Sequence, residues 1–202
     1  GKIGKLRKVA VEYPQGWLSD FLEASDNKQA GWRTDPNKSG KAGSMGDIGT
    51  HAANMVEYVT GKKILKVLSK VNIVVEGRLL EDDGNVLISL EDNIEGNLMT
   101  SQIATGEEND LKIRVWGEKG GIEWCHSNPN TMLLKLNNKP NQILRAGVNN
   151  SYLSDQAIAH CRTPSGHPEG FIEAFANSII SKLQSFDKLL VSAVCSKGEI
   201  MR

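Results

Sequence analysis

The chain has 202 residues, enough for one sizeable hydrophobic core, and its apolar and charged fractions are ordinary for a globular protein. Its 24 Lys and Arg residues equal its 24 Asp and Glu residues, so charge gives no argument for binding nucleic acid or an anionic membrane surface. No apolar run approaches the roughly 20 residues that span a bilayer, and no signal peptide is visible. We therefore expect a cytoplasmic protein.

The three cysteines, Cys125, Cys161 and Cys195, are far apart and odd in number. This spacing argues against a disulfide framework or a structural zinc site and suits a reducing compartment. The chain begins with Gly1 rather than Met and almost at once enters a strand-like run, so we expect a fragment.

The first elements are a strand and a long connection. Residues 6–13 alternate polar and apolar side chains, which predicts a strand ending at Pro14. The segment up to Gly46 is rich in turn-forming residues and too long for a simple connection, so we expect a functional or disordered loop. Trp17 and Trp32 favour a loop that packs against something.

A helix should follow, from Asp47 as N-cap to Gly61 at the C-terminus. Its apolar side chains recur at helical spacing and should face the core. They are Ile48, Ala52, Met55, Val56 and Val59.

The next segment reads as strands separated by short turn sequences. Such spacing leaves no room for crossover helices, so we predict an antiparallel meander. The predicted strands are 64–77, 85–92, 95–104, 111–117, 121–127 and 131–137.

Helical spacing resumes at 167–186, where Pro168 suits the first turn and Phe171, Phe175, Ile179 and Leu183 form an apolar stripe. Residues 187–202 carry weak signals. We predict an α+β fold, with an open, mainly antiparallel sheet and helices packed on one face. The uncovered face would need another domain or subunit, so we expect a homo-oligomer through that face.

A polar stripe lies beside the apolar one on the predicted helix and holds Asp47, His51, Asn54 and Tyr58. A solvated helix face is the ordinary explanation. Against it, the stripe has no lysine, and the sequence "GKAGSMG" before the helix allows a ligand or another backbone to come close. A helix N-terminus also stabilises a charged carboxylate.

A histidine beside an ionised carboxylate can act as a general base near neutral pH, because the anion favours the protonated imidazole. The carboxylate can also accept a hydrogen bond from a substrate hydroxyl. Together they suit removal of a proton from an alcohol, while a nicotinamide cofactor normally accepts the hydride.

The stretch from "GWRTDP" to "GSMGDIGTHAANMVEYVTG" resembles the signature of the Gfo/Idh/MocA family, the glucose–fructose oxidoreductase and inositol dehydrogenase type. The segments "VEYPQGW", "SQIATGEENDLKIRVWGEKGGIEW" and "RTPSGHPEGFIEAFAN" are similar to the same family's C-terminal domain. The resemblance runs from about residue 5 to residue 177 and weakens in the tail.

The resemblance implies an N-terminal Rossmann domain that binds NAD or NADP and a C-terminal domain that contacts a sugar or polyol. This chain matches only the second, so residues 1–202 are expected to form a single C-terminal substrate-binding and oligomerisation domain. No strand–GxGxxG–helix unit is visible, and the family's Glu-Lys-Pro lysine is missing. Alone, the chain should neither bind NAD tightly nor turn over substrate.

The resemblance implies that His51 is the acid/base and Asp47 its partner and substrate anchor. Arg33 and Asp35 are plausible substrate contacts. The alternative for Arg33 is an ion pair with Asp35 or another loop acid. Gln15, Trp32 and His167 complete the substrate-binding candidates. For Trp32 packing is favoured, and for His167 helix capping is favoured.

His126 and His160 have no partners at ligand spacing, so we assign them no role and expect no metal. A second possibility is a non-catalytic sugar-binding or oligomerisation module that retains the family fold. A hydrolase using His51 as base is weaker, because no nucleophile or oxyanion site is evident. The sequence does not decide the substrate or the choice between NAD and NADP.

Overall fold

The computed structural model describes residues 1–180, and the chain divides into two compact units, Gly1–Leu144 and Arg145–Arg202. The first unit contains the sheet, its covering helix and the long connection after the first strand. The expectation of one domain over 1–202 stays a prediction.

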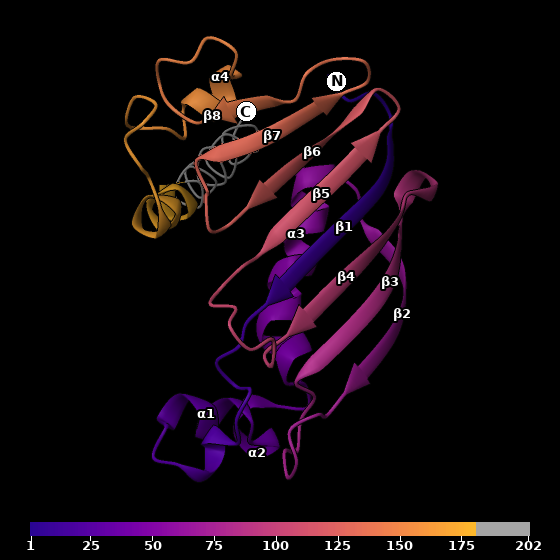
Figure 1. Ribbon diagram of the computed structural model, residues 1–202, viewed down its shortest axis with the longest axis vertical. Helices are drawn as coiled ribbons and strands as arrows, with labels where there is room; N and C mark the ends of the chain where they lie inside the picture. The colour runs from indigo at the N-terminus through magenta and orange to yellow at the C-terminus, as the bar shows by residue number, and fades with distance from the viewer. Residues whose placement is uncertain (181–202) are drawn as a thin grey trace, which may run out of the picture. The chain divides into compact units, whose positions relative to one another are not determined.

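Eight strands form one open sheet in the order β2-β3-β4-β1-β5-β6-β7-β8 (Figure 1). The pairing of β1 with β4 is parallel, and the other described registers are antiparallel. This confirms the predicted open, mainly antiparallel sheet. The strands are β1 (Leu6–Pro14), β2 (Ile64–Asn72), β3 (Asp83–Leu90), β4 (Glu95–Ser101), β5 (Lys112–Gly117), β6 (Gly120–Cys125), β7 (Thr131–Leu136) and β8 (Gln142–Arg145).

The prediction of one continuous meander was wrong at its middle. β1 is inserted between β4 and β5, which therefore follow one another in sequence without pairing. Three consecutive residues of β1, Val9, Ala10 and Val11, are at most 5% exposed. A strand buried on both faces belongs at the centre of a sheet, which explains why the first strand does not lie at an edge.

The strand predicted at 64–77 ends at Asn72. The carboxylate of Asp82 accepts hydrogen bonds from the backbone amides of Val74 (2.9 Å) and Val75 (3.0 Å), so these amides bond within the connection rather than to a neighbouring strand. The short strand β8 and the helix α4 (Asp155–Ile158) were not predicted, because neither is long enough to show a periodic pattern.

The predicted helix consists of a π-helical turn, Met45–Gly49, followed by α3 (Thr50–Thr60). Ile48, Ala52 and Val56 are at most 3% exposed and pack into the core, as the apolar stripe predicted. α3 lies behind the sheet and contacts β1, β4 and β5 (Figure 1). Gly61 ends α3 in the left-handed conformation (φ 65°), which glycine adopts without steric cost.

Asp47 is not the N-cap, because it lies inside the π-helical turn, where its amide donates to the carbonyl of Gly43 (2.9 Å). The carboxylate is therefore free to make contacts outside the helix. π-helical turns are rare and occur often at functional sites.

The connection between β1 and the π-helical turn is ordered into short helices. They are a 3-10 turn (Leu22–Ala24), α1 (Lys28–Arg33) and α2 (Pro36–Ser39). The side chain of Asn27 caps α1 by accepting from the amides of Gln29 and Ala30, both at 3.1 Å.

A buried arginine holds the start of this connection. The guanidinium of Arg78 donates to both carboxylate oxygens of Glu23 (2.8 and 3.0 Å) and to Asp82 (3.2 Å). It also donates to the carbonyls of Leu18 (2.9 Å) and Asp20 (3.0 Å). Since the Arg78 side chain is 1% exposed, this network ties two segments about 55 residues apart without competition from water.

The second unit contains α4 and a helix over residues 171–180. Pro168 precedes this helix rather than lying in its first turn, and the amide of Gly170 donates to the carboxylate of Glu173 (2.8 Å). The predicted stripe residue Leu183 and the segment 187–202 lie outside the described residues. No helix within residues 1–180 is long and apolar enough to cross a membrane.

Replacing Arg78 by Met should lower the free energy of unfolding by about 3–5 kcal/mol, because Asp82 (side chain 1% exposed) would be left charged and buried. Chemical denaturation followed by circular dichroism measures the loss. The control is Arg7→Ala, which removes an exposed ion pair with Glu118 (3.7 Å) and should cost less than about 1 kcal/mol. Equal losses in the two variants would contradict the assigned role of Arg78.

Candidate functional site

A cavity of about 460 Å³ lies at the carboxyl end of β1. Its walls come from the end of β1, the following connection with α1, and the π-helical turn that leads into α3. It is lined by Tyr13, Gln15, Trp17, Asn27, Gln29, Arg33, Asp47, Ile48 and His51.

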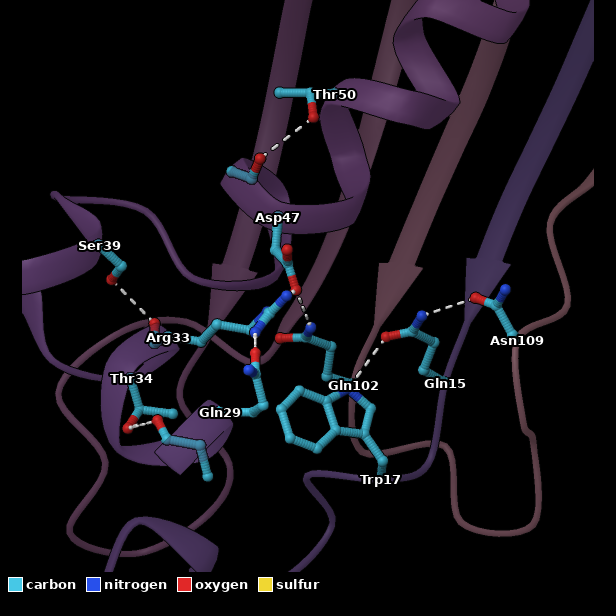
Figure 2. A network of polar contacts seen from close by, with 12 residues as sticks. Gln15, Trp17, Gln29, Arg33, Thr34, Ser39, Asp47, Thr50, Gln102 and Asn109 are labelled. Carbon is cyan, nitrogen blue, oxygen red and sulfur yellow. Dashed lines mark hydrogen bonds and ion pairs between the residues drawn. The ribbon is translucent and has the colours of Figure 1, made fainter. Parts of the chain in front are cut away.

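The carboxylate of Asp47 is held by two donors that meet at one oxygen. Its Oδ2 accepts hydrogen bonds from Arg33 Nε (3.1 Å) and Gln102 Nε2 (2.8 Å), as Figure 2 shows. Within residues 1–180, no group donates to Oδ1. One carboxylate oxygen is thus fixed by the protein, and the other remains an acceptor for a ligand.

Arg33 is held by contacts on several sides. Its guanidinium carbon lies 5.9 Å from the centroid of the Trp17 ring and 5.2 Å from that of Trp32. Arg33 also hydrogen-bonds Gln29 and forms the ion pair with Asp47. Its partner is thus not the expected neighbour Asp35 but the carboxylate of the candidate site.

His51 is exposed on the first turn of α3, and its ring meets that of Tyr13 edge-on at a centroid distance of 6.4 Å. The imidazole has no hydrogen-bond partner among the described residues, and no ion pair joins it to Asp47. The two side chains line the same cavity, but they do not form the direct pair that the helical spacing indicated.

A chain of hydrogen bonds runs along the opposite wall (Figure 2). Asn109 Oδ1 accepts from the Tyr13 hydroxyl and from Gln15 Nε2, both at 2.7 Å, and Gln15 Oε1 accepts from Trp17 Nε1 (3.1 Å). Burial raises the pKa of the Tyr13 phenol, the bond to Asn109 opposes this, and the negative charge of Asp47 raises it further. Tyr13 therefore stays neutral as a hydrogen-bond donor.

The sheet topology brings this wall together. Because β1 separates β4 from β5, the connection between those strands crosses the end of β1. The amide of Ala104 donates to the carbonyl of Gln15 (3.0 Å), and the amide of Gly16 donates to that of Glu107 (2.8 Å). The crossing places Asn109 beside Tyr13 and Gln15, which are more than 90 positions earlier in the sequence.

The small residues before the helix permit a close approach by backbone. A Cβ at Gly43 would lie 2.1 Å from the carbonyl oxygen of Glu81. The carboxylate of Glu81 accepts from the amides of Gly43 (2.8 Å) and Met45 (3.1 Å). The close approach expected from "GKAGSMG" is therefore made by the connection between β2 and β3.

Four of the seven predicted site residues line the cavity, namely Gln15, Arg33, Asp47 and His51. The other three do not. Trp32 is 48% exposed and lies against Arg33, while Asp35 caps α2 and pairs with Lys38 (3.1 Å). His167 belongs to the second unit. The functional roles of all seven stay predictions.

The sequence did not single out Gln102, Asn109, Tyr13, Asn27 or Gln29. Gln102 falls inside the predicted strand 95–104, which in the structure ends at Ser101, and Asn109 falls in the turn sequence that follows. Their contacts could have been predicted only from the strand order. Because β1 lies between β4 and β5, the connection between β4 and β5 must cross the end of β1. Tyr13 fits the strand alternation and gave no separate signal.

The cavity presents several kinds of hydrogen-bonding group. It offers one charged acceptor, a guanidinium, an unpaired imidazole, and amide and phenol groups. Within the described part of the chain, no group of three or more His, Cys, Asp and Glu side chains could hold a metal ion. Residues 1–180 also contain no strand, glycine-rich turn and helix of the kind that binds a dinucleotide pyrophosphate.

The sequence model described as the GFO/IDH/MocA C-terminal domain matches residues 1–123. A protein of Bacillus subtilis strain 168, named uncharacterized oxidoreductase YfiI, is 32% identical over 179 residues, which are 88% of this chain and 45% of that protein.

Two crystal structures from Azotobacter vinelandii share the fold. An inositol dehydrogenase homolog complexed with NAD+ superposes with a TM-score of 0.82 at 31% identity, covering 88% of this chain and 45% of that one. An inositol dehydrogenase homolog complexed with NADH and myo-inositol gives a TM-score of 0.77 at 28% identity, covering 88% and 44%. The chain thus spans less than half the length of these similar proteins.

The electrostatic contact across the cavity can be tested with Asp47→Asn. Removing the negative charge should lower the pKa of Tyr13, since that charge raises it. A pH titration followed by the Tyr13 ¹³Cζ resonance measures the change. Asp35→Asn is the control, because Asp35 does not contribute to the pKa of Tyr13. An equal response in both variants, or none in Asp47→Asn, would rule the contact out.

Proposed function

Because the chain belongs to the GFO/IDH/MocA family, we propose that it is the substrate-binding part of an NAD(P)-dependent oxidoreductase that acts on the CH–OH group of a sugar or polyol. The observation that carries the proposal is that Asp47 and His51 line one cavity, where Oδ1 of Asp47 and the imidazole of His51 have no hydrogen-bond partner among the described residues. A base and a hydroxyl acceptor side by side are what alcohol oxidation requires.

In this function His51 takes the proton from the reacting hydroxyl. The imidazole is exposed and has no partner within the described residues that would compete for its nitrogen atoms. Asp47 accepts a hydrogen bond from a substrate hydroxyl at Oδ1 and so orients it. Arg33 holds the other oxygen of the carboxylate through a charge-assisted contact at 3.1 Å.

A nicotinamide cofactor, when bound, supplies the acceptor for the hydride that leaves the same carbon. The residues of this chain do not fit the dinucleotide itself, because the described part has no pyrophosphate-binding turn. The chain contributes the substrate side of the site, and the cofactor would be held by a separate Rossmann domain. The crystal structures with bound NAD+ and NADH support a nicotinamide cofactor for this chain.

The full-length protein should therefore reduce NAD+ or NADP+ when given the right polyol or aldose. The structure with myo-inositol makes that compound the first substrate to test. Absorbance of the reduced nicotinamide measures turnover. Binding of sugars that is independent of either cofactor, without turnover, would instead identify a non-catalytic sugar-binding module.

Replacing His51 by Ala in the full-length protein should lower kcat by about 10²-fold or more, the usual contribution of a general base. The control is His126→Ala, because His126 lies edge-on to Trp124 and does not line the cavity. A kcat that stays at the wild-type value in His51→Ala would contradict the role of His51 as the general base.

Exposed apolar residues on one face of the sheet support a further part of the proposal, a homo-oligomer. Leu68 of β2 and Leu87 of β3 are paired neighbours that are 71% and 61% exposed. A second hollow of about 440 Å³ is lined by these residues and their neighbours on β2, β3 and β4. Exposed apolar patches on sheets commonly pack against another subunit.

Light scattering should show an oligomer that dissociates when Leu68 and Leu87 are both replaced by Lys, since charged residues at the centre of an apolar contact oppose its burial. Val67→Lys is the matched control. Val67 is 65% exposed on the same strand, but its side chain points to the opposite face of the sheet. A wild-type protein that stays monomeric at high concentration would refute this part of the proposal.

A further inference from the structure

Gln102 is the first residue after β4, and it links three separate segments. Its backbone amide donates to the carbonyl of Asp82 (2.8 Å), and its carbonyl accepts from the amide of Leu18 (3.0 Å). Its side-chain amide donates to Asp47 Oδ2 (2.8 Å). Gln102 is 3% exposed and the side chain of Asp47 is 30% exposed, so the bond between them is partly buried.

Chemistry fixes the orientation of this side-chain amide. An ionised carboxylate only accepts hydrogen bonds, so the nitrogen of Gln102 and not its oxygen must face Asp47. The bond is charge-assisted and partly buried, and charge-assisted bonds are stronger than those between neutral groups.

The two donors to Asp47 come from different kinds of structure. Arg33 belongs to the six-residue helix α1 and is 28% exposed, whereas Gln102 extends from the central strand β4. Both bond Oδ2, as Figure 2 shows. The donor from the sheet is thus buried and anchored to a strand, whereas the arginine is partly exposed and contacts the carboxylate from the loop side.

We propose that Gln102 is a positioning residue that holds Oδ2 of Asp47 and so directs Oδ1 to the substrate hydroxyl. The assignment of Oδ1 to a hydroxyl rests on the proposed function, but the orientation of the carboxylate does not. A residue with a purely structural role at this position would need only the two backbone bonds, which any side chain but proline allows. The side-chain donor is the feature that only the positioning role requires.

The experiment uses the full-length protein with Gln102→Leu and Gln102→Glu, assayed with myo-inositol and NAD+ over a range of pH. Both variants keep the backbone bonds to Asp82 and Leu18. Gln102→Leu should lower kcat/KM by about 10- to 100-fold at every pH, the scale of a hydrogen bond to a charged group. Gln102→Met, which is unbranched, replaces it if Gln102→Leu does not fold.

Gln102→Glu tests the role through the pH dependence of kcat/KM, which a purely structural role would leave unchanged. When protonated, the introduced carboxyl can donate to Oδ2 as the amide does. Burial and the charge of Asp47 raise its pKa above the ordinary value of about 4.3. The ratio of its kcat/KM to that of wild type should therefore be near one at low pH and fall as pH rises through that raised pKa.

The matched controls are Gln142→Leu and Gln142→Glu, because Gln142 is exposed on β8 and does not line the cavity. They should follow the wild-type profile. A Gln102→Glu ratio that does not depend on pH, or an unchanged kcat/KM in Gln102→Leu, would overturn the proposal.

A crystal structure of Gln102→Leu separates this proposal from the proposed function. If the wild-type protein oxidises no sugar or polyol, the proposed function fails, and the structure still decides the role of Gln102. The carboxylate of Asp47 should rotate away from its wild-type orientation in the variant. An unchanged carboxylate would show that Arg33 alone positions it, and the proposal would be wrong.

Discussion

The position of β1 between β4 and β5 is the constraint on which the cavity depends. Neighbouring strands lie about 4.8 Å apart, so the inserted strand holds β4 and β5 roughly 10 Å from each other, too far for a tight hairpin turn. The connection must cross the end of β1, and it bonds to Gln15 and Gly16 as it does so. Gln102 enters this crossing and Asn109 leaves it, so one topological feature places side-chain amides against Asp47 and Gln15, which line the cavity.

Two arginines contribute differently to holding the long connection between β1 and the π-helical turn. Arg78 is buried and fully bonded, and it fixes the segment around Glu23 to the connection between β2 and β3. Arg33 is partly exposed, and its ion pair with Asp47 is open to the cavity. Partly exposed ion pairs are weak, whereas breaking a buried one is costly. Breaking the Arg78 network should therefore destabilise the connection more than breaking the ion pair between Arg33 and Asp47.

The sequence predicted the features that depend on local pattern. Alternation identified most strands, helical spacing placed Ile48, Ala52 and Val56 in the core, and Gly61 marked the end of α3. It did not predict the strand order, because β1 pairs with strands some 85 to 110 residues later. Asp47 and His51 are four residues apart, so the local pattern was enough to predict that they share a site. Gln102 was missed because its contact with Asp47 spans 55 residues.

The π-helical turn explains the remaining difference. On a regular α-helix, Asp47 would lie directly below His51, and the two side chains would face each other. The i→i+5 bonding of Met45–Gly49 widens the turn and changes the angle between them. Asp47 then bonds to the sheet and to α1, and the imidazole of His51 remains unpaired. In the proposed function, this separation would let Asp47 act as a fixed hydroxyl acceptor while His51 exchanges a proton with the same substrate.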